Sequence, residues 1–141
     1  MLPEQVLTGA RVELRALRAS DVTQRYVNWL NDPEVSRFLE SRFINHDLNS
    51  TEEFVASIAE SDSSALFGVF DIVDGLHVGN IKLGPIDAQH GSAEIGLMIG
   101  DRSAWGKGIG SEAIALISQW AFTELGLRKL TAGAYAVNIG S

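Results

Sequence analysis

The chain has 141 residues, of which 45% are hydrophobic and 21% are charged, with no cysteine and a formal net charge of −7. This length and composition predict a single folded domain that buries its own core. The lack of cysteine excludes disulfides and thiolate metal sites, and the negative charge disfavours nucleic acid as a partner, because that binding depends on Lys and Arg neutralising phosphates.

Strand and helix periodicities alternate along the chain, with no repeat, low-complexity tract or linker between them. Apolar residues at every second position indicate strands, and those spaced three and four apart indicate helices. In chain order the patterns predict a strand over 11–17, helices over about 20–30, 34–39 and 51–60, strands over 65–73, 76–83 and 93–99, a helix over 111–125 and a strand over 130–137. We therefore expect one α/β domain over residues 1–141.

Local signals predict where the first helices begin and end. Ser20 and Asp21 are typical N-cap residues, and the helix after them is expected to end before Pro33, because the residue preceding a proline avoids helical geometry. Ser50, with Glu53 three residues later, forms a capping-box pattern for the third helix.

Two further patterns predict how the strands pair. Asp74-Gly75 is the dipeptide of a type I′ turn, so the strands on either side of it are expected to be antiparallel neighbours. The strand over 93–99, the helix over 111–125 and the strand over 130–137 form a βαβ pattern, which predicts that these two strands are parallel. The loop before the helix then lies at the carboxyl end of the first strand.

That loop is the most informative segment of the chain. It reads Trp105-Gly106-Lys107-Gly108-Ile109-Gly110-Ser111 and leads directly into the helix. Glycines let successive main-chain N–H groups turn toward one point, and the unpaired amides and dipole of a helix N-terminus favour an anion there. The pattern therefore predicts a phosphate-binding loop, with a simple tight turn as the alternative.

The strand before this loop has two different faces. Ile95, Leu97 and Ile99 form an apolar face that is expected to join the core. The other face carries one carboxylate, two glycines and one thioether, at Glu94, Gly96, Met98 and Gly100. Glycine inside a strand often marks the close approach of a ligand or of another backbone.

Together these residues resemble the GNAT acetyltransferase superfamily, whose acetyl-CoA motif has the form Gln/Arg-x-x-Gly-x-Gly/Ala. Trp105 stands in place of the leading Gln or Arg, as in the branch of ribosomal-protein N-terminal and amino-sugar acetyltransferases. Four further stretches fit the superfamily in the expected order: Arg11-Val-Glu-Leu-Arg15, Trp29-Leu-Asn-Asp-Pro-Glu-Val35, Ala93-Glu-Ile-Gly96 and Asn138-x-x-Ser141.

The resemblance implies the fold and the activity. The fold is an α/β (α+β) GNAT fold, with a central mixed, mostly antiparallel sheet that contains the parallel unit and a splayed cofactor groove. The activity is transfer of an acetyl group from acetyl-CoA to a primary amine, which is a protein N-terminus, an amino sugar or a small amine. Transfer is expected to be direct, because no cysteine is present to carry the acyl group. Dimers are common among similar proteins, so a homodimer is one expected arrangement.

The resemblance also assigns cofactor contacts. The Met98 main-chain N–H matches the donor to the thioester carbonyl, and Ile99 and Gly100 pair with the pantetheine arm. The pyrophosphate is held by main-chain N–H groups at Gly106, Lys107, Gly108, Ile109, Gly110 and Ser111. Trp105 either shields the phosphates or packs beneath the loop, and Lys107 either adds charge or points to solvent. Asn138 corresponds to an asparagine that reaches the cofactor arm, with a strand-ending turn residue as the alternative.

Glu94 is the candidate general base. A primary amine attacks a thioester only when it is neutral, whereas a lysine-like amine has a pKa near ~10.4, so the site must remove a proton. Glu94 lies on the open face of its strand, four residues before Met98. The alternative is an ordinary surface glutamate.

One departure concerns the segment after Ser141. Members of the superfamily usually continue with another helix and two strands, which carry a tyrosine that acts as general acid toward the CoA thiolate, and no residue here matches it. Either the chain is a piece of a longer protein, or a partner subunit or a solvent proton completes the site. A non-catalytic acyl-CoA-binding module is therefore a second hypothesis.

A third hypothesis is a dinucleotide-binding oxidoreductase, because Gly108-x-Gly110-x-x-Ala113 fits that fingerprint. It is disfavoured because the strand after the helix ends in Val137-Asn138, without the required carboxylate. No metal is expected, since the three histidines are isolated. No run of about 18 apolar residues and no signal-peptide pattern occurs, so we expect a cytoplasmic protein without a membrane partner.

Overall fold

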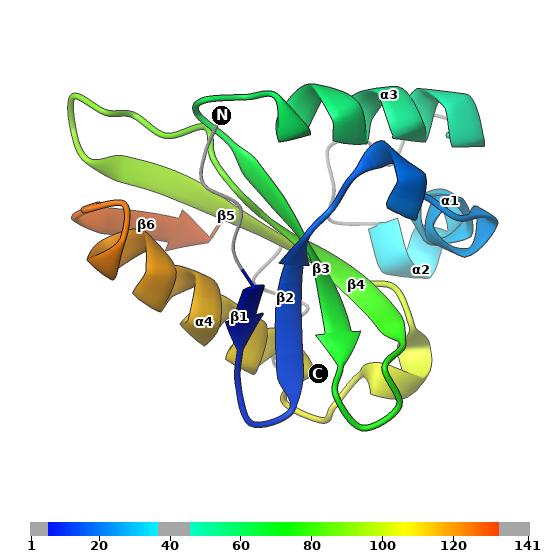
Figure 1. The fold of residues 1–141 in the computed structure, drawn as a ribbon. Coiled ribbons are helices and arrows are strands. Elements are labelled where there is room, and N and C mark those ends of the chain that lie inside the picture. Colours follow the sequence, from blue (N-terminus) through cyan, green and yellow to red (C-terminus); the bar gives the residue numbers. More distant parts are fainter. Residues whose placement is uncertain (1–5, 37–45, 133–141) are drawn as a thin grey trace.

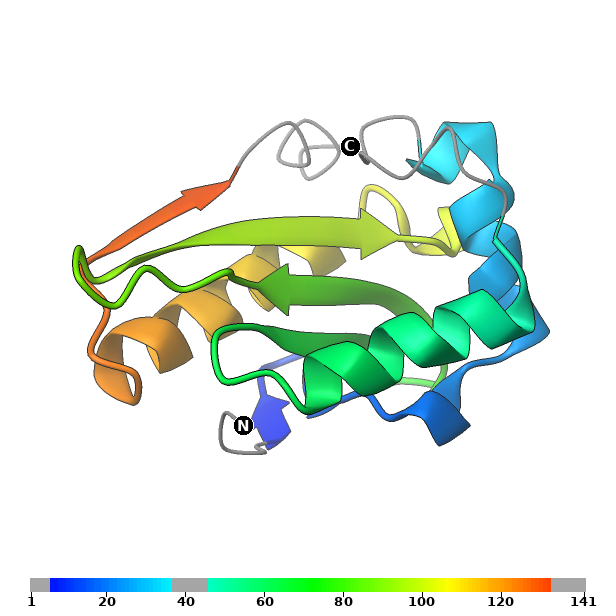
Figure 2. The same cartoon turned by 90° about the horizontal axis from the view of Figure 1, so that it is seen from above.

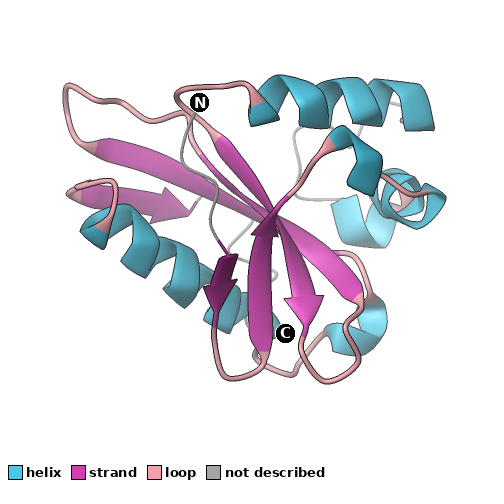
Figure 3. Cartoon of the chain, in the orientation of Figure 1, coloured by secondary structure: helices cyan, strands magenta, loops and turns pink. Residues whose placement is uncertain are grey.

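The computed structural model describes residues 6–36 and 46–132. Its centre is a six-stranded sheet whose strands lie side by side in chain order (Figures 1 and 3). The strands are β1 (Val6–Thr8), β2 (Val12–Ala16), β3 (Ala65–Asp71), β4 (His77–Leu83), β5 (Ser92–Ile99) and β6 (Lys129–Ala132). All neighbouring pairs are antiparallel except β5 and β6, which are parallel. The predicted mixed, mostly antiparallel sheet is therefore confirmed.

The helices form a layer on each face of the sheet (Figures 1 and 2). Helix α4 (Ile109–Thr123) covers one face, and the other face carries α1 (Gln24–Asn31), α2 (Pro33–Ser36) and α3 (Leu48–Ala59). Two short 3-10 helices, η1 (Ala19–Asp21) and η3 (Arg102–Ala104), precede α1 and α4. No helix in the described ranges combines the length and the apolar character needed to cross a lipid bilayer.

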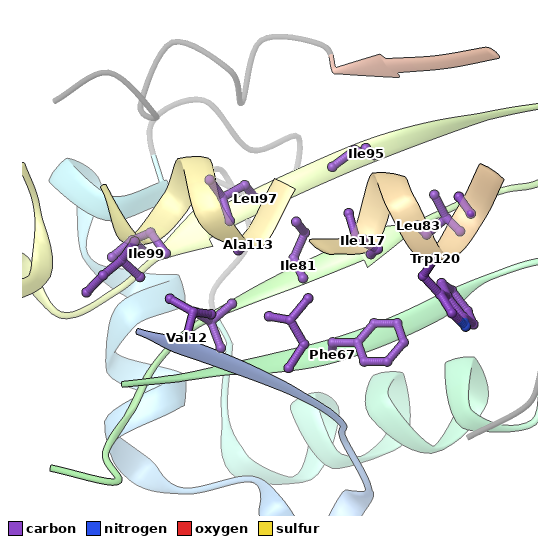
Figure 4. Packing of buried hydrophobic residues seen from close by; sticks show 14 of the residues in the cluster. Val12, Phe67, Ile81, Leu83, Ile95, Leu97, Ile99, Ala113, Ile117 and Trp120 are labelled. Atoms are coloured by element: carbon purple, nitrogen blue, oxygen red, sulfur yellow. The ribbon is translucent and has the colours of Figure 1, made fainter. Parts of the chain in front are cut away.

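The larger apolar cluster fills the space between the sheet and α4 (Figure 4). The alternation predicted for β5 places Ile95, Leu97 and Ile99 in it, each buried. From α4, Ile117 and Trp120 enter the same cluster, and the Trp120 ring meets the Phe67 ring edge to face with 5.2 Å between centroids. This packing holds α4, and with it the glycine loop, at a set position against β5.

Two helix starts differ from the sequence prediction. Helix α1 is capped by Thr23, whose hydroxyl accepts the Tyr26 N–H at 3.2 Å, whereas the Asp21 carboxylate accepts the Arg18 N–H in η1. Helix α3 begins three residues early, because Asp47 is its N-cap and forms the capping box with Ser50. Each helix start has more than one residue that can act as an N-cap within a few positions, and the conformation of the backbone decides which of them does so.

The β3–β4 turn and the start of α4 also differ. Gly75 has a φ of +73°, but no non-glycine residue in the described ranges has a positive φ. A type I′ turn needs positive φ at both central residues, so the turn is a longer loop that Gly75 closes by donating its N–H to the Asp71 carbonyl at 2.7 Å. Helix α4 begins at Ile109, two residues before the predicted start.

Gly100, at the end of β5, has a packing role that the sequence did not reveal. Its N–H donates to the Val78 carbonyl at 2.8 Å, and a β-carbon added there would overlap the Trp29 ring of α1. Trp29 itself is buried. The close approach at this glycine is therefore between β5 and α1.

Gly100→Ala is expected to lower the free energy of unfolding by about 1–3 kcal/mol, the usual cost of overpacking a core. Urea unfolding followed by circular dichroism measures the loss. The same substitution should cost clearly less in a Trp29→Leu background, where the larger ring is gone. Equal costs in the two backgrounds would contradict this packing.

Candidate active site

The glycine loop ends in an uncapped helix N-terminus. Gly106 and Gly108 have φ values of +76° and +77°, and Gly108 is the N-cap of α4 without a side-chain cap. The first helical hydrogen bond runs from the Glu112 N–H to the Gly108 carbonyl at 3.0 Å. Within the described residues, no backbone carbonyl accepts from the amides of Ile109, Gly110 and Ser111. These amides, at the positive end of the α4 dipole, can bind an anion.

Trp105 packs beneath this loop. Its indole Nε1–H donates to the Ile99 carbonyl at 2.8 Å, and its ring contacts both apolar clusters. The structure shows the packing predicted for Trp105, and its contact with the cofactor phosphates stays a prediction. The Lys107 side chain is exposed, between Gly106 and Gly108 of the loop.

Two ion pairs attach the segment before the loop to the helices of the opposite layer. Arg25 of α1 donates to the Asp101 carboxylate at 2.8 Å, and Arg102 donates to both carboxylate oxygens of Asp32 at 2.7 and 2.8 Å. The hydrogen bond from the Ser103 hydroxyl lowers the pKa of Asp101, so this carboxylate stays charged. Such exposed pairs contribute little stability, but they connect α1 and its end to the segment that follows β5.

The register of β5 determines which of its amides are accessible. The Gly84 N–H donates to the Glu94 carbonyl and the Gly100 N–H donates to the Val78 carbonyl, both at 2.8 Å. Because the direction of backbone groups alternates along a strand, the even-numbered residues of β5 face β4. The Ile99 carbonyl points to the other edge, where Trp105 bonds to it.

This register speaks against the predicted role of Met98. Met98 lies opposite Asn80 in the β4–β5 ladder, so its N–H is directed to β4, as is that of Gly100. The spacing from Gly108 identifies a residue in the strand, but it does not tell which edge of the strand the N–H of that residue faces. A shift of one residue turns the N–H to the opposite edge. The amides of Leu97 and Ile99 face the edge away from β4, on the side where β6 pairs with β5 from Ser92↔Lys129 to Ile95↔Ala132.

The Glu94 side chain is exposed, in the part of β5 that pairs with β6. It lies opposite Thr131 of β6 and borders an open hollow of about 240 Å³, shared with Lys129 and Ser92. Among the described residues its carboxylate has no hydrogen-bond or ion-pair partner, which leaves its oxygens accessible to an incoming group. Asn138, the remaining predicted cofactor contact, lies outside the described residues.

Comparison with known proteins identifies the family. A family model described as an acetyltransferase (GNAT) domain matches residues 11–141. The chain belongs to the GNAT acetyltransferase family. The predicted superfamily is thereby confirmed, and with it the predicted class of enzyme, an acyltransferase.

Relatives of this GNAT chain carry matching names. A Bacillus licheniformis protein named uncharacterized N-acetyltransferase p20 is 28% identical over 132 residues, which cover 91% of this chain and 72% of that protein. Human alpha/beta-tubulin-N-acetyltransferase 9 is 28% identical over 138 residues, covering 90% of this chain and 66% of its own length. The chain thus spans about two thirds to three quarters of these two relatives.

Solved structures show the same GNAT fold. The crystal structure of spermidine N-acetyltransferase from Vibrio cholerae, in complex with CoA and spermine, is 25% identical with a TM-score of 0.75, covering 88% of this chain and 71% of that one. A Bacillus anthracis GNAT-family acetyltransferase, 21% identical over 91% of this chain and 72% of its own, also has a TM-score of 0.75. The predicted GNAT fold is confirmed.

The GNAT domain also contains a half-buried histidine beside α1. The His77 ring stacks on Phe70 and meets Trp29 edge to face, and its Nε2 is 2.8 Å from Oδ1 of the buried Asn80. Burial lowers the pKa of His77 below its usual 6.5, and the bond to Asn80 opposes this only in part. The sequence showed only that His77 has no metal-ligand partner. In the described ranges no group of three or more His, Cys, Asp or Glu side chains is placed so that it could hold a metal ion.

Stability is therefore expected to fall as the pH falls below about 6.5. The pKa of His77 is lower in the folded state, so the unfolded chain binds the proton first and protonation favours unfolding. His77→Gln, which retains an amide donor near Asn80, should reduce the loss of unfolding free energy between pH 7.5 and pH 5.5. Urea titrations at the two pH values measure it, and an unchanged difference would contradict a buried, neutral His77.

Proposed function

We propose that this GNAT domain transfers an acetyl group from acetyl-CoA directly to the nitrogen of a primary amine. The observation that carries the proposal is the set of unpaired amides at Ile109, Gly110 and Ser111, next to the end of β5. An anion of the size of a diphosphate fits such a loop because Gly106 and Gly108 hold left-handed backbone without a side chain. The residues present therefore suit the diphosphate of CoA, with Lys107 as an added positive charge.

The amides of β5 that face away from β4 suit the rest of the cofactor. A pantetheine arm that pairs with the strand would use the Leu97 and Ile99 backbone, in place of Met98 and Gly100. One of these two N–H groups would hydrogen-bond the thioester oxygen, which gains negative charge when the amine attacks. Asn138 stays a predicted contact to the same arm.

The chemistry needs one base. The amine nitrogen forms a bond to the acetyl carbon, loses a proton, and the carbon–sulfur bond breaks with release of the CoA thiolate. We propose Glu94 as the group that takes the proton, directly or through a water molecule, because its carboxylate is exposed without a partner among the described residues. The thiolate then needs a proton from a donor that the described residues do not identify.

The acceptor is proposed as a cationic primary amine. The net charge of −7 favours a cation over an anion, and spermine is bound in the similar Vibrio cholerae enzyme. A polyamine is therefore the first acceptor to test, followed by a peptide with a free N-terminus and by an amino sugar. A cytoplasmic location, a homodimer, the absence of a nucleic-acid partner and a single domain over residues 1–141 stay predictions from the sequence.

Thiol release from acetyl-CoA, measured with each amine in turn, tests the proposal. Amine-dependent release of free CoA, with an acetylated product in the mass spectrum, is the expected result. Thermal stabilisation by CoA without release for any amine would instead favour a non-catalytic acyl-CoA-binding module. Membership of the GNAT family speaks against the dinucleotide-binding alternative.

A further inference from the structure

Glu112, in the first turn of α4, binds the backbone of a distant turn. Its carboxylate accepts hydrogen bonds from three consecutive amides, two in the turn between β1 and β2 and one at the first residue of β2: Ala10 at 3.2 Å, Arg11 at 3.0 and 3.3 Å, and Val12 at 2.5 Å. These residues lie about a hundred positions away in the sequence. From the sequence, Glu112 is only an acidic residue in the first turn of the helix predicted over 111–125.

The β1–β2 turn has a closed conformation and, at Gly9, the space that the Glu112 carboxylate needs. Gly9 closes the turn by donating its N–H to the Val12 carbonyl at 2.8 Å, and a β-carbon at Gly9 would lie 2.9 Å from the Glu112 carboxyl carbon. Arg11 extends the connection, because its guanidinium binds the buried Asp71 at 3.2 Å at the end of β3. Two strand ends are thus joined to the first turn of α4, at the end of the molecule that carries the glycine loop (Figure 1).

Glu112 follows Ser111, the last of the three unpaired amides, in the same helical turn. A helix N-terminus without a side-chain cap frays readily, and an anion site needs its donors held in place before the ligand arrives. The Glu112 carboxylate restrains this turn from the side. The amides of the β1–β2 turn also surround its negative charge, which would otherwise repel a phosphate at the same helix end.

We propose that Glu112 is a positioning residue for the diphosphate site, acting through the amides of Ile109, Gly110 and Ser111 and not by touching the cofactor. The proposal rests on the proposed function, since it assumes that CoA binds this loop. It predicts that loss of the carboxylate weakens CoA binding more than it slows turnover of bound substrate.

The test compares CoA binding by calorimetry in the unsubstituted chain, Glu112→Gln and Gly9→Ala. Glu112→Gln keeps the length of the side chain, but glutamine can accept hydrogen bonds through only one oxygen. Gly9→Ala keeps Glu112, but the added methyl group pushes its carboxylate away from the amides of the turn. Each should raise the Kd for CoA about tenfold, which corresponds to about 1.4 kcal/mol. The KM for acetyl-CoA should rise in parallel, with kcat nearly unchanged. Glu124→Gln, with the same charge change at the other end of α4, is the matched control and should bind CoA normally.

The outcomes separate the two proposals. If the unsubstituted chain does not bind CoA, the proposed function fails and this role with it. If it binds CoA and Glu112→Gln binds equally tightly, the positioning role is overturned, because the carboxylate then has no effect on the site. Tighter binding by Glu112→Gln also overturns it, because the carboxylate would then act only by repelling the diphosphate. If Glu112→Gln does not fold, Gly9→Ala decides alone. The double variant Gly9→Ala/Glu112→Gln should bind CoA no more weakly than either single variant, because both substitutions break the same contact.

Discussion

Replacing Glu94 by glutamine is expected to lower kcat for acetyl transfer by about 10²- to 10³-fold, within the range that a general base contributes. Glutamine preserves the shape of the side chain but cannot take a proton from the attacking amine. The Kd for acetyl-CoA should change little, because Glu94 lies on β5 well before the glycine loop. Steady-state kinetics with a responsive amine, together with calorimetry for acetyl-CoA, measure the two effects separately.

The matched control for this experiment is Glu52→Gln. Glu52 is an exposed glutamate on α3, so the substitution makes the same change in charge without touching β5. It should leave both kcat and acetyl-CoA binding unchanged. If Glu94→Gln lowers affinity and rate equally, Glu94 is not the base. If it affects neither, Glu94 is an ordinary surface residue.

Replacing Gly108 by valine is expected to abolish measurable CoA binding. The φ of +77° at Gly108 costs a residue with a β-carbon about 1–2 kcal/mol, and a β-branched residue more. The chain can relieve this strain only by rotating the peptide groups next to Gly108, which carry the amides proposed to hold the diphosphate. No atom lies within 4 Å of an added β-carbon, so the effect comes from the backbone and not from a clash. CoA titration calorimetry measures the loss.

Gly126→Val provides the control, because Gly126 follows the other end of the same helix with a φ of +68° and equally open surroundings. Both variants should lose similar amounts of unfolding free energy, but only Gly108→Val should lose CoA. Normal CoA affinity in Gly108→Val would show that the glycine loop does not hold the diphosphate.

The features predicted well from the sequence depend on residues close together in the chain. Alternation over 93–99 correctly predicted β5 and the burial of Ile95, Leu97 and Ile99. The glycine spacing correctly predicted a loop that leads into a helix, and the βαβ pattern predicted the parallel pairing of β5 and β6. Helix starts were less accurate, because Asp47 and Ser50 are both good caps and the local sequence does not choose between them.

The features that the sequence missed depend on contacts between distant segments. The edge to which the Met98 amide points follows from the register between β4 and β5, which a residue count along one strand does not contain. Gly100 resembles a ligand-contact glycine in the sequence, but its neighbour is the Trp29 ring from α1. Only a signal relating Glu112 to the β1–β2 turn, such as paired substitution among homologues, would have revealed that contact.

By itself, the sequence determined the order of strands β2 to β6 and of the α-helices between them, the position of the glycine loop and the GNAT family, because periodicity and backbone freedom are properties of neighbouring residues. It did not predict β1 (Val6–Thr8), which is too short to show a periodicity. Only the tertiary structure decided which amides of β5 face away from β4, what fills the space above Gly100, and what holds the first turn of α4. Those outcomes depend on register and side-chain packing between elements up to a hundred residues apart in the chain, where each contact is set by the whole fold and by no local pattern.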